Sequence, residues 1–190
     1  TVLLLDISHS MILYGEDRIT PAKQVALGLV ELIQTKFPRD SIDVVLFGNE
    51  AFPVPIERLP YVQVGPFHTN TRAALQAARK ILRRRKHANK QVILITDGKP
   101  TVITDEEGVI YRNTFGLDPK IISKTLDEAV ALRRDRIPIT TFMIATDPYL
   151  QQFVHRLTEL NRGKAYFSEA GNLGEFVLVD FVRNRRGKMR

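Results

Sequence analysis

Three side chains that carry oxygen follow the first apolar run of the chain at alternate positions. Val2 to Leu5 is uninterrupted and apolar, and Asp6, Ser8 and Ser10 come directly after it. Alternate residues on a chain that leaves a strand can point to the same side. One carboxylate and two hydroxyls can therefore reach a common point.

A second carboxylate follows another apolar run, because Asp97 comes directly after Val92 to Thr96. In an open α/β sheet, ligands bind beyond the carboxyl ends of strands, where the strand order reverses. If the two strands are neighbours, Asp6 and Asp97 converge, and a hard cation between them removes their repulsion. Carboxylate and hydroxyl oxygens without thiolates or clustered imidazoles favour Mg²⁺ or Mn²⁺ over zinc or copper, with Ca²⁺ a further candidate.

Each half of this pattern also has a simpler interpretation. Ser-His-Ser is common in loops, and Asp-Gly after a strand is a common turn. Together, in this order and each at the end of a strand, the two halves indicate a metal site. Magnesium prefers six ligands and retains water, so at least one position should stay exchangeable and open to a carboxylate from a partner.

Apolar runs alternate with amphipathic runs along the whole chain, which predicts the elements that position these side chains. Such alternation is typical of an α/β fold, here a Rossmann-like, doubly wound, mostly parallel sheet with helices on both faces. An edge strand is expected at 51–55, because its prolines cannot serve a central ladder. The other strands are expected at 2–5, 42–47, 92–95, 139–144 and 165–167.

Helix starts are marked by capping residues followed by proline. Thr20-Pro21, Asp118-Pro119 and Asp147-Pro148 each predict such a start, and further helices are expected at 71–84 and from about 173 into the tail. The helix that starts at Asp118-Pro119 is expected to bury Ile122, Leu126, Ala129 and Val130.

The segment 101–117 is long for a loop in this fold. Glu107-Gly108 lies between two short apolar runs, which predicts a small hairpin. It is either an interaction feature or a tolerated surface insertion, and we favour the former.

Composition limits the function classes. The 190 residues indicate one domain, expected at 1–182, with a basic tail at 183–190. The chain starts inside its first strand, so we expect it to be part of a longer protein. It has no cysteine, which excludes disulfides and thiol catalysis. No apolar run approaches the roughly 20 residues that cross a bilayer.

Three segments resemble the von Willebrand factor A (VWA) domain with its metal-ion-dependent adhesion site. They are DISHSM, TNTRAAL and ITDGKP. The family pattern is Asp-x-Ser-x-Ser, a Thr in a later loop and an Asp that is usually followed by Gly. The middle ligand is assigned to Thr69 rather than Thr71, because the family's Thr stands several residues before an Ala-Leu pair. The resemblance thus implies the metal ligands Asp6, Ser8, Ser10, Thr69 and Asp97.

The resemblance covers nearly the whole chain and is closest to intracellular bacterial VWA proteins. Some of these act beside MoxR-type AAA+ ATPases or in magnesium-chelatase-like complexes, which implies a cytoplasmic, non-enzymatic module. The implied partner is a protein that supplies an Asp or Glu to a Mg²⁺. His9, His68 and Thr71 are expected at the partner-binding rim. Phe67-His68 stands where the family often has Gly-Gly, and His9 where it often has Gly.

Two other functions are considered. A metal-activated water with His9 or His68 as base would hydrolyse a phosphoester. Against this, neither histidine has an obvious orienting acid, and no glycine-rich phosphate loop is present. The net charge of +7 and the basic clusters at 83–86, 133–136 and 183–190 permit contact with nucleic acid. The tail lacks interleaved aromatic residues, so nucleic acid is the less favoured partner.

Overall fold

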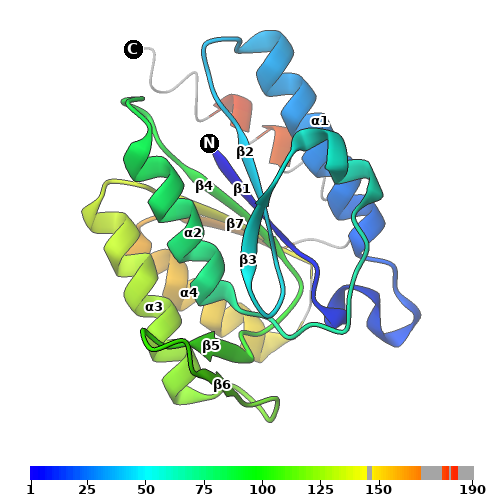
Figure 1. Cartoon of the computed structure of the whole chain (residues 1–190), viewed down its shortest axis with the longest axis vertical. Coiled ribbons are helices and arrows are strands. Elements are labelled where there is room, and N and C mark those ends of the chain that lie inside the picture. The colour runs from blue at the N-terminus through cyan, green and yellow to red at the C-terminus, as the bar shows by residue number, and fades with distance from the viewer. Residues whose placement is uncertain (145–146, 168–176, 180, 184–190) are drawn as a thin grey trace.

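A six-stranded sheet runs through the centre of the molecule (Figure 1). The computed structural model describes residues 1–144, 147–167, 177–179 and 181–183. The strand order is β3-β2-β1-β4-β7-β8, and only β3 is antiparallel to its neighbour. The predicted fold class is confirmed. The strands are β1 (Val2–Asp6), β2 (Asp43–Phe47), β3 (Ala51–Val54), β4 (Val92–Thr96), β7 (Ile139–Met143) and β8 (Lys164–Phe167).

The strand order reverses between β1 and β4. These strands are parallel neighbours, and Leu5 lies opposite Ile95 in their register. Both strands therefore end at the same level of the sheet, and the condition for bringing Asp6 and Asp97 together is met.

Helices cover both faces of the sheet (Figure 1). Leu3 and Leu5 belong to the core packed with α1 (Ile19–Lys36), Val177 and Phe181. Val2 and Leu4 point to the opposite face, since successive strand residues alternate, and they pack with three other helices. These are α2 (Thr71–Arg84), α3 (Pro119–Arg134) and α4 (Pro148–Asn161).

The predicted helix starts are confirmed for α3 and α4, whereas α1 begins two residues earlier than predicted, with Arg18 rather than Thr20 at the N-cap. Asp118 and Asp147 each accept two backbone N–H groups in the first turn of their helices. In α1, Thr20 is already helical, and its N–H donates to Asp17 Oδ1 at 2.9 Å. The capping group is therefore the Asp17 carboxylate, three residues before Thr20.

The buried stripe of α3 differs from the predicted one. The fully buried residues are Ile121, Thr125, Ala129 and Leu132, so only Ala129 is shared with the prediction. Ile122 and Leu126 are partly buried and pack at the edge of the same core. The helix contacts both α2 and α4. Apolar side chains on two adjacent stripes therefore find neighbours, and apolar character alone does not separate the central stripe from the flanking one.

The predicted hairpin is confirmed as β5 (Val102–Thr104) paired antiparallel with β6 (Ile110–Arg112). Gly108 has φ +83°, a left-handed conformation that glycine adopts without steric cost. Two short 3₁₀ segments were not predicted, η1 (His9–Gly15) and η2 (Ile56–Tyr61).

The predicted last helix is described only at 177–179 and 181–183, which are helical. Its expected start near 173 and the tail from 184 lie outside the described residues. Among the described residues, no helix has the length and apolar character that crossing a bilayer requires.

Candidate metal centre

The three residues of the first motif fold into a tight turn where β1 ends. The N–H of Ser8 donates to Asp6 Oδ1 at 2.9 Å, and Ser8 Oγ lies 3.0 Å from Ser10 Oγ. Ser10 Oγ donates to Asp97 Oδ1 at 2.8 Å, across 87 positions of sequence. Asp6, Ser8 and Asp97 are buried, and Ser10 is half-buried. The structure thus brings the two halves of the motif into direct contact.

The space beside Gly98 locates the point where the side chains converge. A Cβ atom placed on Gly98 would lie 2.9 Å from Ser10 Oγ, 3.1 Å from Thr69 Oγ1 and 3.8 Å from Asp6 Oδ2. Two of these oxygens, of Asp6 and Ser10, come from the end of β1 and the turn after it, and the third comes from the distant Thr69 loop. They surround a small volume that stays open only because residue 98 has no side chain.

Thr69 is held in place by a reciprocal pair of hydrogen bonds with Thr101. The N–H of Thr69 donates to Thr101 Oγ1 at 3.0 Å, and the N–H of Thr101 donates to the Thr69 carbonyl at 3.0 Å. Thr101 immediately precedes β5, so the base of the hairpin positions the Thr69 loop. The sequence offered no sign of this link.

Thr96 supports the first carboxylate and was missed in the sequence. Its Oγ1 donates to Asp6 Oδ2 at 2.5 Å and accepts from the N–H of Gly98 at 3.2 Å. The signal was a hydroxyl at the last position of β4, directly before Asp97.

Arg18 contacts the second carboxylate and was also missed. Its Nη1 donates to Asp97 Oδ2 at 2.8 Å, while Nε and Nη2 both donate to Glu16 Oε2, at 2.9 and 2.6 Å. Arg18 is the residue before the first turn of α1, where the helix dipole disfavours a positive charge. That unfavourable position was the available signal that this arginine serves another purpose.

Both carboxylates are destabilised as anions in the metal-free protein. Burial, together with the charge of the nearby Asp97, raises the pKa of Asp6 to about 7. Burial also raises the pKa of Asp97, although hydrogen bonds from Ser10 and Arg18 oppose that shift. A divalent cation among these oxygens would favour both charged forms. The two carboxylates, the three hydroxyls and the open volume beside Gly98 thus fit a hard divalent metal ion.

Sequence and structure comparisons identify the family and the fold of this chain. The family described as "Rv0959-like protein, vWA domain" matches residues 1–182. The chain belongs to this vWA family. An uncharacterized protein of Mycobacterium tuberculosis, Rv0959, is 30% identical over 189 residues, which cover 97% of this chain and 28% of that protein. The chain therefore spans well under half of the length of its curated relatives.

Solved structures show the same fold at low sequence identity. BatB from Bacteroides thetaiotaomicron has a TM-score of 0.67 at 14% identity, with 96% of each chain covered. Proximal thread matrix protein 1 from the mussel byssus, with a zinc-occupied MIDAS motif, has a TM-score of 0.67 at 17% identity. That match covers 93% of this chain and 43% of the mussel protein. A divalent metal is therefore bound by at least one protein of this fold.

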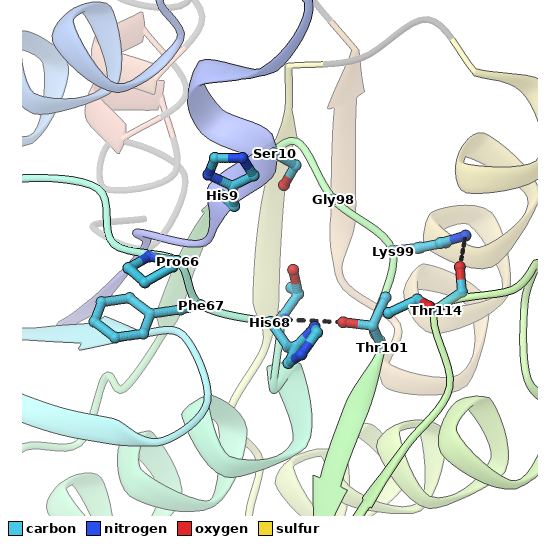
Figure 2. Close-up of a pocket in the computed structure, with 10 residues that line it drawn as sticks. His9, Ser10, Pro66, Phe67, His68, Gly98, Lys99, Thr101 and Thr114 are labelled. Atoms are coloured by element: carbon cyan, nitrogen blue, oxygen red, sulfur yellow. Dashed lines mark hydrogen bonds between the residues drawn. The ribbon is translucent and has the colours of Figure 1, made fainter.

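A pocket of about 360 Å³ opens beside the candidate metal centre of this vWA domain (Figure 2). Ser10 and Thr69 of the candidate centre line it together with Lys99 and Thr114. Lys99 Nζ donates to the Thr114 carbonyl at 2.9 Å, which joins the loop after β4 to the segment after β6.

The three residues expected at the rim are placed differently. His9 is exposed and His68 half-buried, and both line the pocket. Thr71 is 1% exposed, and its Oγ1 has no hydrogen-bond partner within the described part of the chain. Thr71 therefore lies beneath the rim, at the first turn of α2.

No described carboxylate is hydrogen-bonded to the ring of His9 or His68. The neighbour of the His68 ring is Arg112, with Nη1 at 3.5 Å from Nε2. A catalytic base is commonly oriented by a further group, so the geometry gives the hydrolase alternative no specific support. Within the described ranges no group of three or more His, Cys, Asp and Glu side chains is positioned to hold a metal. Among the residues that the structure describes, a metal held here would therefore need hydroxyl oxygens beside the two carboxylates.

Proposed function

We propose that this vWA domain is a metal-dependent protein-interaction module. Its ligand is an Asp or Glu of a partner protein, bound through a Mg²⁺. The observation that carries the proposal is the convergence of oxygens from the segment 6–10 and from Thr69 on the space beside Gly98. The metal ligands are Asp6, Ser8, Ser10, Thr69 and Asp97.

The donor set explains why such a metal would seek an external ligand. Two carboxylates and three neutral hydroxyls supply five oxygens, and Mg²⁺ prefers six. The bound ion supplies positive charge at the open position, where a carboxylate is a better ligand than water. Its family also supports this function, because vWA domains often mediate metal-dependent protein interactions and are typically non-enzymatic.

The surface around the centre favours an acidic partner with apolar neighbours. Lys99 and Arg112 both lie beside the pocket, and neither forms an ion pair with a described carboxylate. Val109, Ile110 and Phe115 are 58, 57 and 88% exposed on the hairpin and the segment after it. We therefore assign the hairpin to the partner-binding face, with His9 and His68 at its rim.

The wider setting of the module is a further part of the proposal. The matching relatives are several times longer than this chain, which suits one module of a multiprotein assembly. We place that assembly in the cytoplasm, with an AAA+ ATPase as the candidate partner.

Affinity capture with and without EDTA tests the function. Wild-type domain with Mg²⁺ should retain a protein partner that EDTA releases, and Asp97→Ala should retain none. Asp127→Ala is the matched control, because Asp127 is an exposed aspartate on α3. Capture that persists in EDTA, or in Asp97→Ala, would show that the metal does not mediate binding.

Hydrolysis is the alternative for the same site. Purified domain with Mn²⁺ should not hydrolyse a generic phosphoester above background. Hydrolysis that disappears in Asp6→Ala would contradict the assignment as an interaction module. Binding to nucleic acid would instead weaken steeply with salt and survive EDTA.

A further inference from the structure

Arg18 lies between a buried carboxylate of the metal centre and an exposed carboxylate at the surface. The side chain of Asp97 is 0% exposed, that of Arg18 18% and that of Glu16 64%. One edge of the guanidinium faces inward to Asp97, and the other edge faces outward to Glu16. This arrangement places a permanent positive charge directly against one proposed metal ligand.

Both oxygens of Asp97 already have donors in the metal-free protein. Oδ1 accepts from Ser10 Oγ and Oδ2 accepts from Arg18 Nη1, each at 2.8 Å. A metal that uses Asp97 must therefore share this carboxylate with a guanidinium. Because the guanidinium is cationic, it also repels the incoming ion at short range, where the partly buried setting weakens screening.

The outer contact is the more easily exchanged of the two. Glu16 is exposed, and ion pairs between exposed side chains contribute little to stability. A carboxylate from outside can therefore replace Glu16 on the same edge of the guanidinium. A carboxylate that contacted both this edge and the metal would offset the charge of both cations.

We propose that Arg18 competes with the metal for Asp97, and so keeps the metal centre weak until a carboxylate arrives from a partner. The inference rests on the proposed function and adds its regulation: metal and ligand bind together more tightly than either binds alone. Glu16 acts as the internal stand-in for the partner's carboxylate. Reciprocity between the two binding events follows from thermodynamic linkage.

Calorimetric titration with Mn²⁺ alone tests the competition. Arg18→Gln removes the cation and keeps a hydrogen-bonding side chain, so we expect Mn²⁺ to bind roughly tenfold or more tightly than to wild type. Arg84→Gln is the matched control: it removes the same charge from an exposed arginine in the last turn of α2 and should leave the affinity unchanged. Equal affinities of wild type and Arg18→Gln would overturn the inference and leave the metal centre intact.

The remaining outcomes are also decisive. Binding to Arg18→Gln without measurable binding to wild type would support the competition strongly. Binding to neither chain would overturn both the inference and the proposed function. Thermal unfolding in EDTA shows whether Arg18→Gln is folded. If it is not, Glu16→Gln carries the test: with less negative charge beside Arg18, Mn²⁺ should bind more weakly, and tighter binding would contradict the inference.

Sodium acetate as a carboxylate probe tests the coupling. Acetate should tighten Mn²⁺ binding to wild type more than to Arg18→Gln, because only wild type offers the guanidinium edge. An equal effect on both proteins would show that the carboxylate is received without Arg18.

Discussion

The sheet has two edges at the ends of its strands: the amino edge, where β7 begins, and the carboxyl edge, where β1 and β4 end. They use buried polar side chains in opposite ways. At the edge where β7 begins, Asn161 is 3% exposed and makes three hydrogen bonds to backbone groups. Its Oδ1 accepts from the N–H of Ile139, and its Nδ2 donates to the carbonyls of Ala129 and Ile137. At the edge where β1 and β4 end, Asp6 and Asp97 lie close together, and burial raises the pKa of each.

This difference distinguishes a buried polar group that stabilises the fold from buried polar groups that are available for function. The Asn161 amide finds its partners inside the chain, so its burial needs no external group. The paired carboxylates lack a countercharge that balances both of them, which is costly in a buried setting. Charged side chains at the amino edge also find partners inside the chain, because Arg79 pairs with Asp135 at 2.7 Å and Arg85 with Asp43 at 2.6 Å.

The largest effect on stability is expected from Asn161→Ala. This substitution leaves buried backbone groups without partners, and we expect it to lower the free energy of unfolding by about 3 kcal/mol. Urea unfolding measures the loss, with the exposed Asn89→Ala as control. Mn²⁺ affinity of the folded variant should stay unchanged. A large loss of metal affinity would mean that the two edges are not independent.

The next largest effect is expected on metal affinity in Gly98→Ala. The added methyl group would fill the space between Ser10 Oγ and Thr69 Oγ1, so Mn²⁺ should bind roughly tenfold or more weakly. Gly28→Ala is the matched control, because the nearest atom to its Cβ lies 4.0 Å away. Undiminished binding to Gly98→Ala would place the metal elsewhere.

A smaller effect is expected from pH in the absence of metal. The folded-state pKa of Asp6 is about 7, well above its ordinary 3.8, so folding takes up a proton between these values. The stability from this group is full below about pH 3.8 and is lost as the pH rises through about 7. Asp17 and Asp118 have lowered pKa values, and their contributions are lost only in more acidic solution.

Urea unfolding in EDTA at several pH values between about 5 and 8 measures this dependence. The free energy of unfolding should fall as pH rises, and the fall should be smaller in Asp6→Asn. Saturating Mn²⁺ should reduce the fall in wild type, because the metal binds the charged carboxylates. A wild-type stability that rises over this range would contradict the raised pKa of Asp6.

The smallest effect on stability is expected from an exposed ion pair at the amino edge of the sheet. Arg85→Gln removes an ion pair with Asp43 in which the arginine side chain is 44% exposed. Such pairs are worth less than about 1 kcal/mol, so the urea midpoint should shift little and metal affinity should not change. A loss comparable to that of Asn161→Ala would show that this edge depends on its charges.

The fold and the convergence of the oxygen-bearing side chains were predictable because both depend on local patterns. The uninterrupted apolar run before Asp6 predicted a central strand, and the alternate spacing of Asp6, Ser8 and Ser10 predicted their convergence. Arg18 and Thr101 were not predictable in the same way. Their roles depend on contacts 79 and 32 positions away in sequence, which only the packing of loops at the carboxyl edge creates.

Crystals of the domain soaked in Mn²⁺ give the most direct test of the central claim, since anomalous scattering locates the ion. We predict one strong anomalous peak at the carboxyl edge, within coordination distance of Ser8, Ser10 and Thr69 oxygens and next to Asp6 and Asp97. Absence of a peak there at saturating Mn²⁺, or a peak only elsewhere on the surface, would contradict the account.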